Sequence, residues 1–168
     1  MIVSLIGIPG SHLEEIGKIV SEKTGIPCRS TDAILEKENG KSAALLYEEK
    51  GEVDFRRMER KVLVSLLDEF EGKDLILVCG DGLPTSVYEA NQIKKKTLPV
   101  WVKKSVKAIA ADESVVSLPP YRGDRKKFVD ACVNRYTAYQ ELNGRIVENP
   151  SDEGCAAWIS SFLLSCSC

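Results

Sequence analysis

The chain has 168 residues, of which 43% are hydrophobic and 29% are charged, and its formal net charge is −2. This composition is ordinary for a soluble globular chain and predicts a single domain over residues 1–168, with no general attraction to nucleic acid or to an anionic membrane. No apolar run reaches the ~18 residues of a membrane span, and Met1 opens directly into a strand-like run rather than a basic leader. We therefore expect a cytoplasmic protein.

Apolar runs alternate with amphipathic stretches along the chain, which predicts an α/β domain built on a parallel sheet. Strands are expected at 2–6, 27–30, 75–79, 98–102 and 145–148. Helices are expected at 13–23, 31–38, 42–49, 53–70, 88–95, 105–111, 124–142 and 153–164. The segment 112–125 contains Pro119, Pro120 and Gly123 between two helices, and it is either a lid over a site or a plain surface loop.

The turn between the first strand and the first helix has the frame of a phosphate-binding loop, G-x-x-x-x-G-K-[ST]. In such a loop backbone N–H groups cradle phosphate, the lysine neutralises it and the hydroxyl holds Mg²⁺. Here His12 stands at the second glycine, Leu13 at the lysine and Glu14 at the hydroxyl. The degenerate loop comprises Gly7, Pro9, Gly10, Ser11, His12, Leu13 and Glu14.

Glu14 and Glu15 are expected in the first turn of the helix, where they satisfy the helix dipole from within. One such charge ~4 Å from a triphosphate costs about 4 kcal/mol at an effective dielectric constant of about 20. Losing a cation on which phosphoryl transfer relies commonly slows the reaction by ~10²–10³. The sequence therefore predicts a very slow kinase or none, with ATP and Mg²⁺ as ligands only if other basic residues compensate.

The chain offers little for a metal site. Its single histidine, His12, lies far in sequence from every cysteine, so zinc is not expected, although a metal held by His12 with Glu14 and Glu15 is a minor alternative. The six cysteines show no C-x-x-C pattern and are expected to be reduced and structural. The redox state of Cys166 and Cys168, near the terminus, stays open.

Four polar groups follow predicted strands or share a helix face. Asp32 follows the second strand, where it either faces a ligand crevice or caps a helix beginning at Ala33. Arg56 and Glu59 are three residues apart, which suits either a positioned arginine that grips a carboxylate or a solvated charged face. The Gly80-Asp81-Gly82 turn allows close approach to a ligand or simply turns the chain, and Arg135 alone says little.

Taken together, these motifs resemble the shikimate kinase family, P-loop enzymes that phosphorylate the 3-hydroxyl of shikimate. The matching pieces, in order, are G-x-x-G-S at 7–11, S-T-D at 30–32 for the family's D-T-D, G-K-S at 40–42, G-E-x-x-F-R-x-x-E at 51–59, G-D-G at 80–82 for G-G-G, and R-x-x-x-Y at 135–139. The resemblance implies a nucleoside-monophosphate-kinase-like three-layer sandwich. Its parallel sheet would have five strands in the order 2-3-1-4-5.

The resemblance also implies which residues contact shikimate. Asp32 would bind two hydroxyls and is the candidate catalytic base, Arg56 and Arg135 would bind the carboxylate, and Glu59 would orient Arg56. Gly80 and Gly82 would form the glycine turn of the site. Asp81 replaces the middle glycine of that turn and places a carboxylate where an anionic substrate approaches.

The nucleotide side departs from the family almost everywhere. Ser30 stands for the metal-associated aspartate, Ala111 for the arginine that stacks on adenine, and Leu118 for the lid arginine, for which the nearby Arg122 could substitute. The leading hypothesis is a protein that binds shikimate or a related ring acid without efficient phosphate transfer, and that senses it or regulates a protein partner of the aromatic pathway. The alternatives are an active shikimate kinase, with Arg122 or Lys18 supplying the missing charge, and a protein-interaction scaffold.

Overall fold

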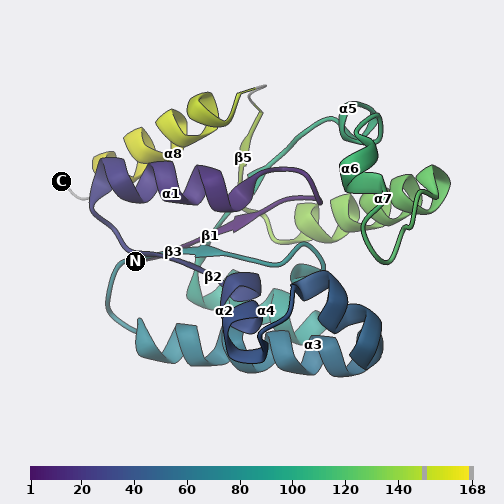
Figure 1. The fold of residues 1–168 in the computed structure, drawn as a ribbon. Coiled ribbons are helices and arrows are strands. Elements are labelled where there is room, and N and C mark those ends of the chain that lie inside the picture. The colour runs from purple at the N-terminus through teal and green to yellow at the C-terminus, as the bar shows by residue number, and fades with distance from the viewer. Residues whose placement is uncertain (149–150, 167–168) are drawn as a thin grey trace.

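The computed structural model describes residues 1–148 and 151–166. Its centre is a five-stranded sheet in the order β2-β3-β1-β4-β5, and every neighbouring pair is parallel (Figure 1). This confirms the predicted α/β class and the strand order 2-3-1-4-5. The strands are β1 (Ile2–Ile6), β2 (Cys28–Ser30), β3 (Leu75–Val78), β4 (Leu98–Val102) and β5 (Arg145–Val147).

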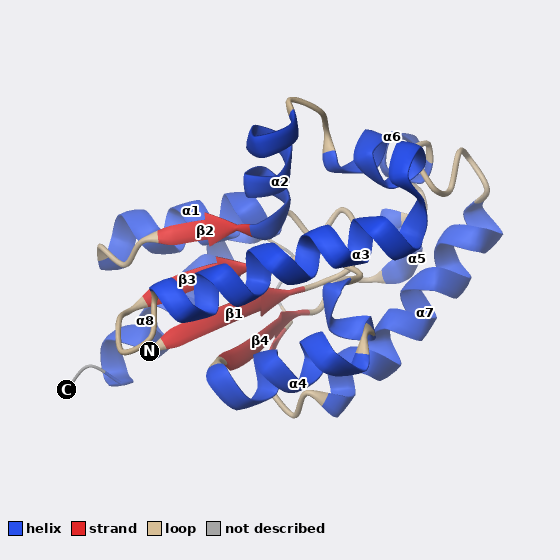
Figure 2. Cartoon of the chain, turned by 90° about the horizontal axis from the view of Figure 1, so that it is seen from below, coloured by secondary structure: helices blue, strands red, loops and turns tan. Residues whose placement is uncertain are grey.

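Helices cover both faces of the sheet. On one face lie α1 and α8, and α3 and α4 cover the other (Figures 1 and 2). The helices are α1 (Leu13–Thr24), α2 (Thr31–Asn39), α3 (Ala43–Glu69), the 3₁₀ turn η1 (Leu83–Thr85), α4 (Val87–Lys96), α5 (Val106–Ile109), α6 (Glu113–Val116), α7 (Arg125–Glu141) and α8 (Asp152–Cys166).

Two hydrophobic cores result from this layering. Because successive strand residues point to opposite faces, Val3 and Leu5 of β1 pack with α1 and α8, while Ile2 and Ile6 pack with α3, α4 and α7. Both faces of β1 and β3 are buried, which explains why these strands read as continuous apolar runs.

The helices predicted at 42–49 and 53–70 form one element, α3, with a sharp kink between them. Gly51 at the kink has φ 76° and ψ 165°, a backbone conformation that glycine adopts without steric cost. The predicted interruption therefore exists, but as a bend rather than a loop. The kink leaves Tyr47 on one arm of α3 and Phe55 on the other in an edge-to-face contact, with ring centroids 5.5 Å apart.

The segment 112–125 is ordered by its own capping interactions. Asp112 accepts a hydrogen bond from the Ser114 N–H at 2.9 Å at the start of α6, and Asp124 accepts one from the Lys127 N–H at 2.9 Å at the start of α7. The segment also contains a buried aromatic residue, Tyr121. The segment, predicted as either a lid or a plain surface loop, thus also contains a short helix, α6, that the sequence pattern did not predict.

Within residues 1–148 and 151–166, no helix is long and apolar enough to cross a membrane. Cys79 and Cys132 are buried thiols and Cys166 is an exposed one, whereas Cys168 lies outside the described residues.

Candidate functional site

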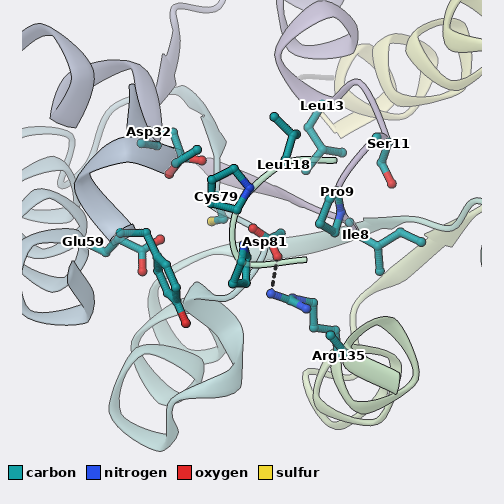
Figure 3. Close-up of a pocket in the computed structure, with 18 of the residues that line it drawn as sticks. Ile8, Pro9, Ser11, Leu13, Asp32, Glu59, Cys79, Asp81, Leu118 and Arg135 are labelled. Carbon is teal, nitrogen blue, oxygen red and sulfur yellow. Dashed lines mark ion pairs between the residues drawn. The ribbon is translucent and has the colours of Figure 1, made fainter. Parts of the chain in front are cut away.

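A cavity of about 700 Å³ lies at the carboxyl ends of the strands, where parallel α/β sheets hold their ligands (Figure 3). Its walls come from the loop after β1, the start of α2, the kinked α3, the turn after β3, the segment 118–121 and α7. The sequence-predicted residues that line it are Asp32, Arg56, Glu59, Asp81, Arg135 and all seven residues of the degenerate loop.

Asp32 points into this cavity rather than capping a helix. The N-cap of α2 is Ser30, whose hydroxyl accepts a hydrogen bond from the Ala33 N–H at 3.2 Å, so the alternative that Asp32 caps a helix starting at Ala33 is wrong. The Asp32 Oδ1 atom is buried and has no hydrogen-bond partner in the described part of the chain. Burial, together with the nearby Glu59 and Asp81 carboxylates, raises the pKa of Asp32 to about 8.

Gly80 brings the backbone after β3 close to two acidic side chains. Its N–H donates to the Thr31 hydroxyl at 2.9 Å, which ties this turn to the start of α2. A Cβ at this position would lie 2.5 Å from Glu59 Oε1 and 2.6 Å from Asp32 Oδ1. A side chain at residue 80 would therefore displace one or both of these carboxyl groups, whereas glycine leaves room for both.

Arg56 and Glu59 form a buried ion pair on α3. The side chains are 18% and 1% exposed, so the alternative of a solvated charged face is wrong. The guanidinium lies over Gly82, where a Cβ would be 2.0 Å from Nη2. Burial raises the pKa of the Glu59 carboxyl to about 7, even though the Arg56 cation beside it acts in the opposite direction.

Arg135 reaches the cavity from α7 and pairs with Asp81. Its Nη2 atom lies 2.6 Å from Asp81 Oδ2, and the two side chains are 12% and 34% exposed (Figure 3). The Tyr139 hydroxyl, one helical turn beyond Arg135, lies 2.9 Å from the Gly7 carbonyl and 2.5 Å from the Asp81 carbonyl. Tyr139 thereby holds the degenerate loop and the turn after β3 together.

The degenerate loop is fixed by contacts with its own chain. His12 adopts a left-handed conformation with φ 54°, and its Nδ1 lies 2.8 Å from Asp152 at the start of α8. Lys104 lies 3.1 Å from the same carboxylate. Glu14 accepts a hydrogen bond from the Ser30 hydroxyl at 2.5 Å.

Three predicted site residues, Gly80, Gly82 and Arg122, do not line the cavity. Gly80 and Gly82 support the wall from behind, through the close approaches described above. Arg122 is 70% exposed, pairs with Glu48 of α3 and does not line the cavity, whereas Leu118 of the same segment does.

Some lining residues carried no sequence signal. Tyr47 and Tyr121 line the cavity but belong to no motif at a recognisable spacing, whereas Glu52 belongs to the G-E-x-x-F-R-x-x-E motif but was given no role of its own. Tyr139 was part of the R-x-x-x-Y pattern, yet its role in joining two loops depends on contacts 58 and 132 residues away along the chain.

The parallel sheet of order 2-3-1-4-5, the loop between β1 and α1 and a cavity at the strand ends together define a P-loop kinase fold. A family model described as shikimate kinase matches residues 14–160. The chain belongs to the shikimate kinase family.

Individual relatives agree with this membership. The chain is 30% identical over 142 residues to a shikimate kinase of Caulobacter vibrioides, covering 83% of this chain and 70% of that protein. It is 35% identical over 101 residues to one from Dehalococcoides mccartyi and 31% identical over 107 residues to one from Sulfurihydrogenibium. These last two matches span 56% and 63% of the relatives' own lengths.

Solved structures share the fold. The shikimate kinase from Acinetobacter baumannii in complex with shikimate has a TM-score of 0.85 at 22% identity, over 98% of this chain and 93% of that one. The shikimate kinase from Aquifex aeolicus has a TM-score of 0.81 at 22% identity, over 99% of this chain and 98% of that one.

Proposed function

We propose that this protein binds shikimate or a related hydroxylated ring acid and transfers phosphate to it slowly or not at all. The observation that carries the proposal is the contrast between the two sides of one cavity. On the acceptor side, Asp32, Arg56 and Arg135 are gathered at a buried wall. On the nucleotide side, the loop carries Leu13 and Glu14 in place of a cation and a hydroxyl.

The acceptor side suits a small polyhydroxylated acid. A carboxylate with an unsatisfied buried oxygen, as at Asp32, accepts hydrogen bonds from ring hydroxyls. Guanidinium groups bind a ligand carboxylate in a planar, bidentate geometry, and Glu59 holds that of Arg56 in place. A ligand bound between these groups would have one face toward the degenerate loop.

The nucleotide side does not suit Mg·ATP. The first turn of α1 carries Glu14 and Glu15. Their negative charges interact favourably with the helix N-terminus, as a bound phosphate would, and they repel a phosphate that approaches it. Glu14 is also bonded to Ser30, and His12 is turned toward Asp152.

The first alternative, an active kinase, requires a compensating cation. Arg122 is paired with Glu48, and Lys18 is exposed on α1 outside the cavity wall, so each would have to change its position. Lys127 does line the cavity, but its ammonium donates to the Pro120 carbonyl at 2.8 Å. The leading proposal therefore needs fewer rearrangements. A role as metabolite sensor or partner of an aromatic-pathway protein, in a single cytoplasmic domain, is part of the same proposal.

Calorimetric titration of shikimate, first alone and then with Mg·ATP, tests the proposal. Saturable heat from shikimate that falls at least ~10-fold in affinity in Arg56→Ala or Arg135→Ala, with no heat from ATP, is the expected result. A coupled assay of ADP release distinguishes the alternatives. Turnover near ~1 s⁻¹ or above would establish an active kinase. The absence of both shikimate binding and ADP release, together with a stable complex with another protein, would favour a scaffold.

A further inference from the structure

Both arginines of the cavity are already paired with carboxylates of the chain itself. Arg56 pairs with Glu59, and Arg135 lies 2.6 Å from Asp81. The two pairs differ in accessibility, because Glu59 is 1% exposed whereas Asp81 is 34% exposed and faces the cavity (Figure 3). The Asp81 carboxylate therefore occupies the position at which an anionic ligand would bind Arg135.

Asp81 is held in this position by its backbone. It belongs to the turn after β3, and its carbonyl accepts a hydrogen bond from the buried Tyr139 hydroxyl at 2.5 Å. Tyr139 and Arg135 lie one turn apart on α7, so the residue that fixes Asp81 and the residue that pairs with it share one rigid helix. A ligand can displace the carboxylate of Asp81 only by rotating its side chain away.

Among the described residues, the lining of the cavity contains more acidic than basic side chains. Its walls contain six acidic side chains and three from lysine or arginine, the acidic ones being Glu14, Asp32, Glu36, Glu52, Glu59 and Asp81. A ring acid that enters must compete for Arg135 and bring another negative charge near Asp81, which is unfavourable at short range. A ring that donates only hydroxyl hydrogens satisfies Asp32 without that conflict.

We propose that Asp81 is a specificity residue that competes with the ligand carboxylate for Arg135, so that the cavity accepts a hydroxylated ring with a neutral substituent more readily than the corresponding acid. This inference rests on the proposed function, namely that the cavity binds a hydroxylated ring. In this inference, Asp81 of the chain itself is the carboxylate that pairs with Arg135, in place of the carboxylate of a ring acid.

The test compares shikimate with its methyl ester, which has the same ring and hydroxyls but no charge. The dissociation constants of both are measured by calorimetry for the unchanged protein, Asp81→Gly and Asp81→Asn. We expect the ester to bind at least as tightly as the acid to the unchanged protein. In both variants the affinity for the acid should rise at least ~10-fold relative to the ester.

A matched control separates local competition from the general field of the cavity. Glu52 also lines the cavity, but it forms no part of the Arg135 pair, so Glu52→Gln removes one negative charge elsewhere. This variant should change the acid-to-ester ratio less than ~2-fold, because Glu52 is not the carboxylate that pairs with Arg135. The Asp81→Asn variant has nearly the same side-chain volume as the unchanged protein. It therefore provides the test if Asp81→Gly disturbs the turn.

The outcomes distinguish the inference from the proposed function. Binding of both compounds with an acid-to-ester ratio that Asp81→Gly and Asp81→Asn leave unchanged overturns the inference alone. Binding of neither compound to any of the three proteins overturns the inference and the proposed function together. A ratio that shifts toward the acid in both Asp81 variants, but not in Glu52→Gln, supports both.

Discussion

The hydroxyl of Ser30 donates a hydrogen bond to Glu14 Oε1 at 2.5 Å, joining the N-cap of α2 to the first turn of α1. The resemblance to the family's motifs implies that both residues stand at positions that hold the metal in a P-loop kinase. Their mutual contact means that the chain satisfies at this point polar groups that would otherwise require a ligand. This contact is consistent with the proposed loss of phosphate transfer.

Restoring the loop residues should restore nucleotide binding. In the combined variant His12→Gly, Leu13→Lys and Glu14→Ser, the lysine supplies a positive charge, the serine removes a negative one, and glycine suits the left-handed backbone at residue 12. We expect affinity for Mg·ATP to rise at least ~10-fold, measured by calorimetry. Leu13→Lys alone, with Glu14 still present, should gain less. Equal failure of both variants would show that the backbone of the loop, rather than its side chains, prevents binding.

Much of the fold was predictable because it depends on local patterns. Strands at 2–6 and 98–102 agree with the structure, since hydrophobic runs bounded by turn residues identify buried strands. The i, i+3 spacing of Arg56 and Glu59 likewise predicted their contact.

The remaining contacts of the site could not be read from spacing. The His12–Asp152 contact joins residues 140 positions apart, and the pairing of Asp81 with Arg135 depends on how α7 packs beside the turn after β3. The sequence indicated that a carboxylate at Asp81 would disturb an anion site. It gave no indication that Arg135 would be its partner.

The glycine at position 82 should matter for ligand binding more than for stability. Gly82 has an ordinary helical backbone conformation, φ −92° and ψ −11°, so alanine causes no backbone strain there. The new Cβ would, however, lie 2.0 Å from Arg56 Nη2 and would displace the guanidinium from Glu59. We expect Gly82→Ala to lower the free energy of unfolding by about 1 kcal/mol and to weaken shikimate binding as much as Arg56→Ala does. Retained affinity would show that Arg56 does not touch the ligand.

The buried hydroxyl of Tyr139 should contribute measurably to stability. It lies within hydrogen-bond distance of the carbonyls of Gly7 and Asp81, and Tyr139→Phe would remove the single hydroxyl hydrogen that these two acceptors share. We expect a loss of between about 1 and 2 kcal/mol in the free energy of unfolding by urea. Tyr88, which is 45% exposed on α4, provides the control, since Tyr88→Phe should change stability by less than about 0.5 kcal/mol. Equal effects in both variants would contradict the assigned role.

The raised pKa of Asp32 should make stability depend on pH in a definite direction. Burial raises the pKa of its carboxyl from 3.8 to about 8, so between pH ~4 and ~8 the folded state holds a proton that the unfolded state has lost. The free energy of unfolding should therefore fall as pH rises through this window, by on the order of 1 kcal/mol per pH unit, with Glu59 adding to the slope between pH ~4.5 and ~7. Asp32→Asn, followed by urea unfolding at several pH values, should flatten the dependence. Asp68 lies on the exposed side of α3. In Asp68→Asn, the free energy of unfolding should depend on pH as it does in the unchanged protein. If the pH dependence persists in Asp32→Asn, the Asp32 carboxyl does not hold this proton. Asp32 would then not be neutral in the cavity.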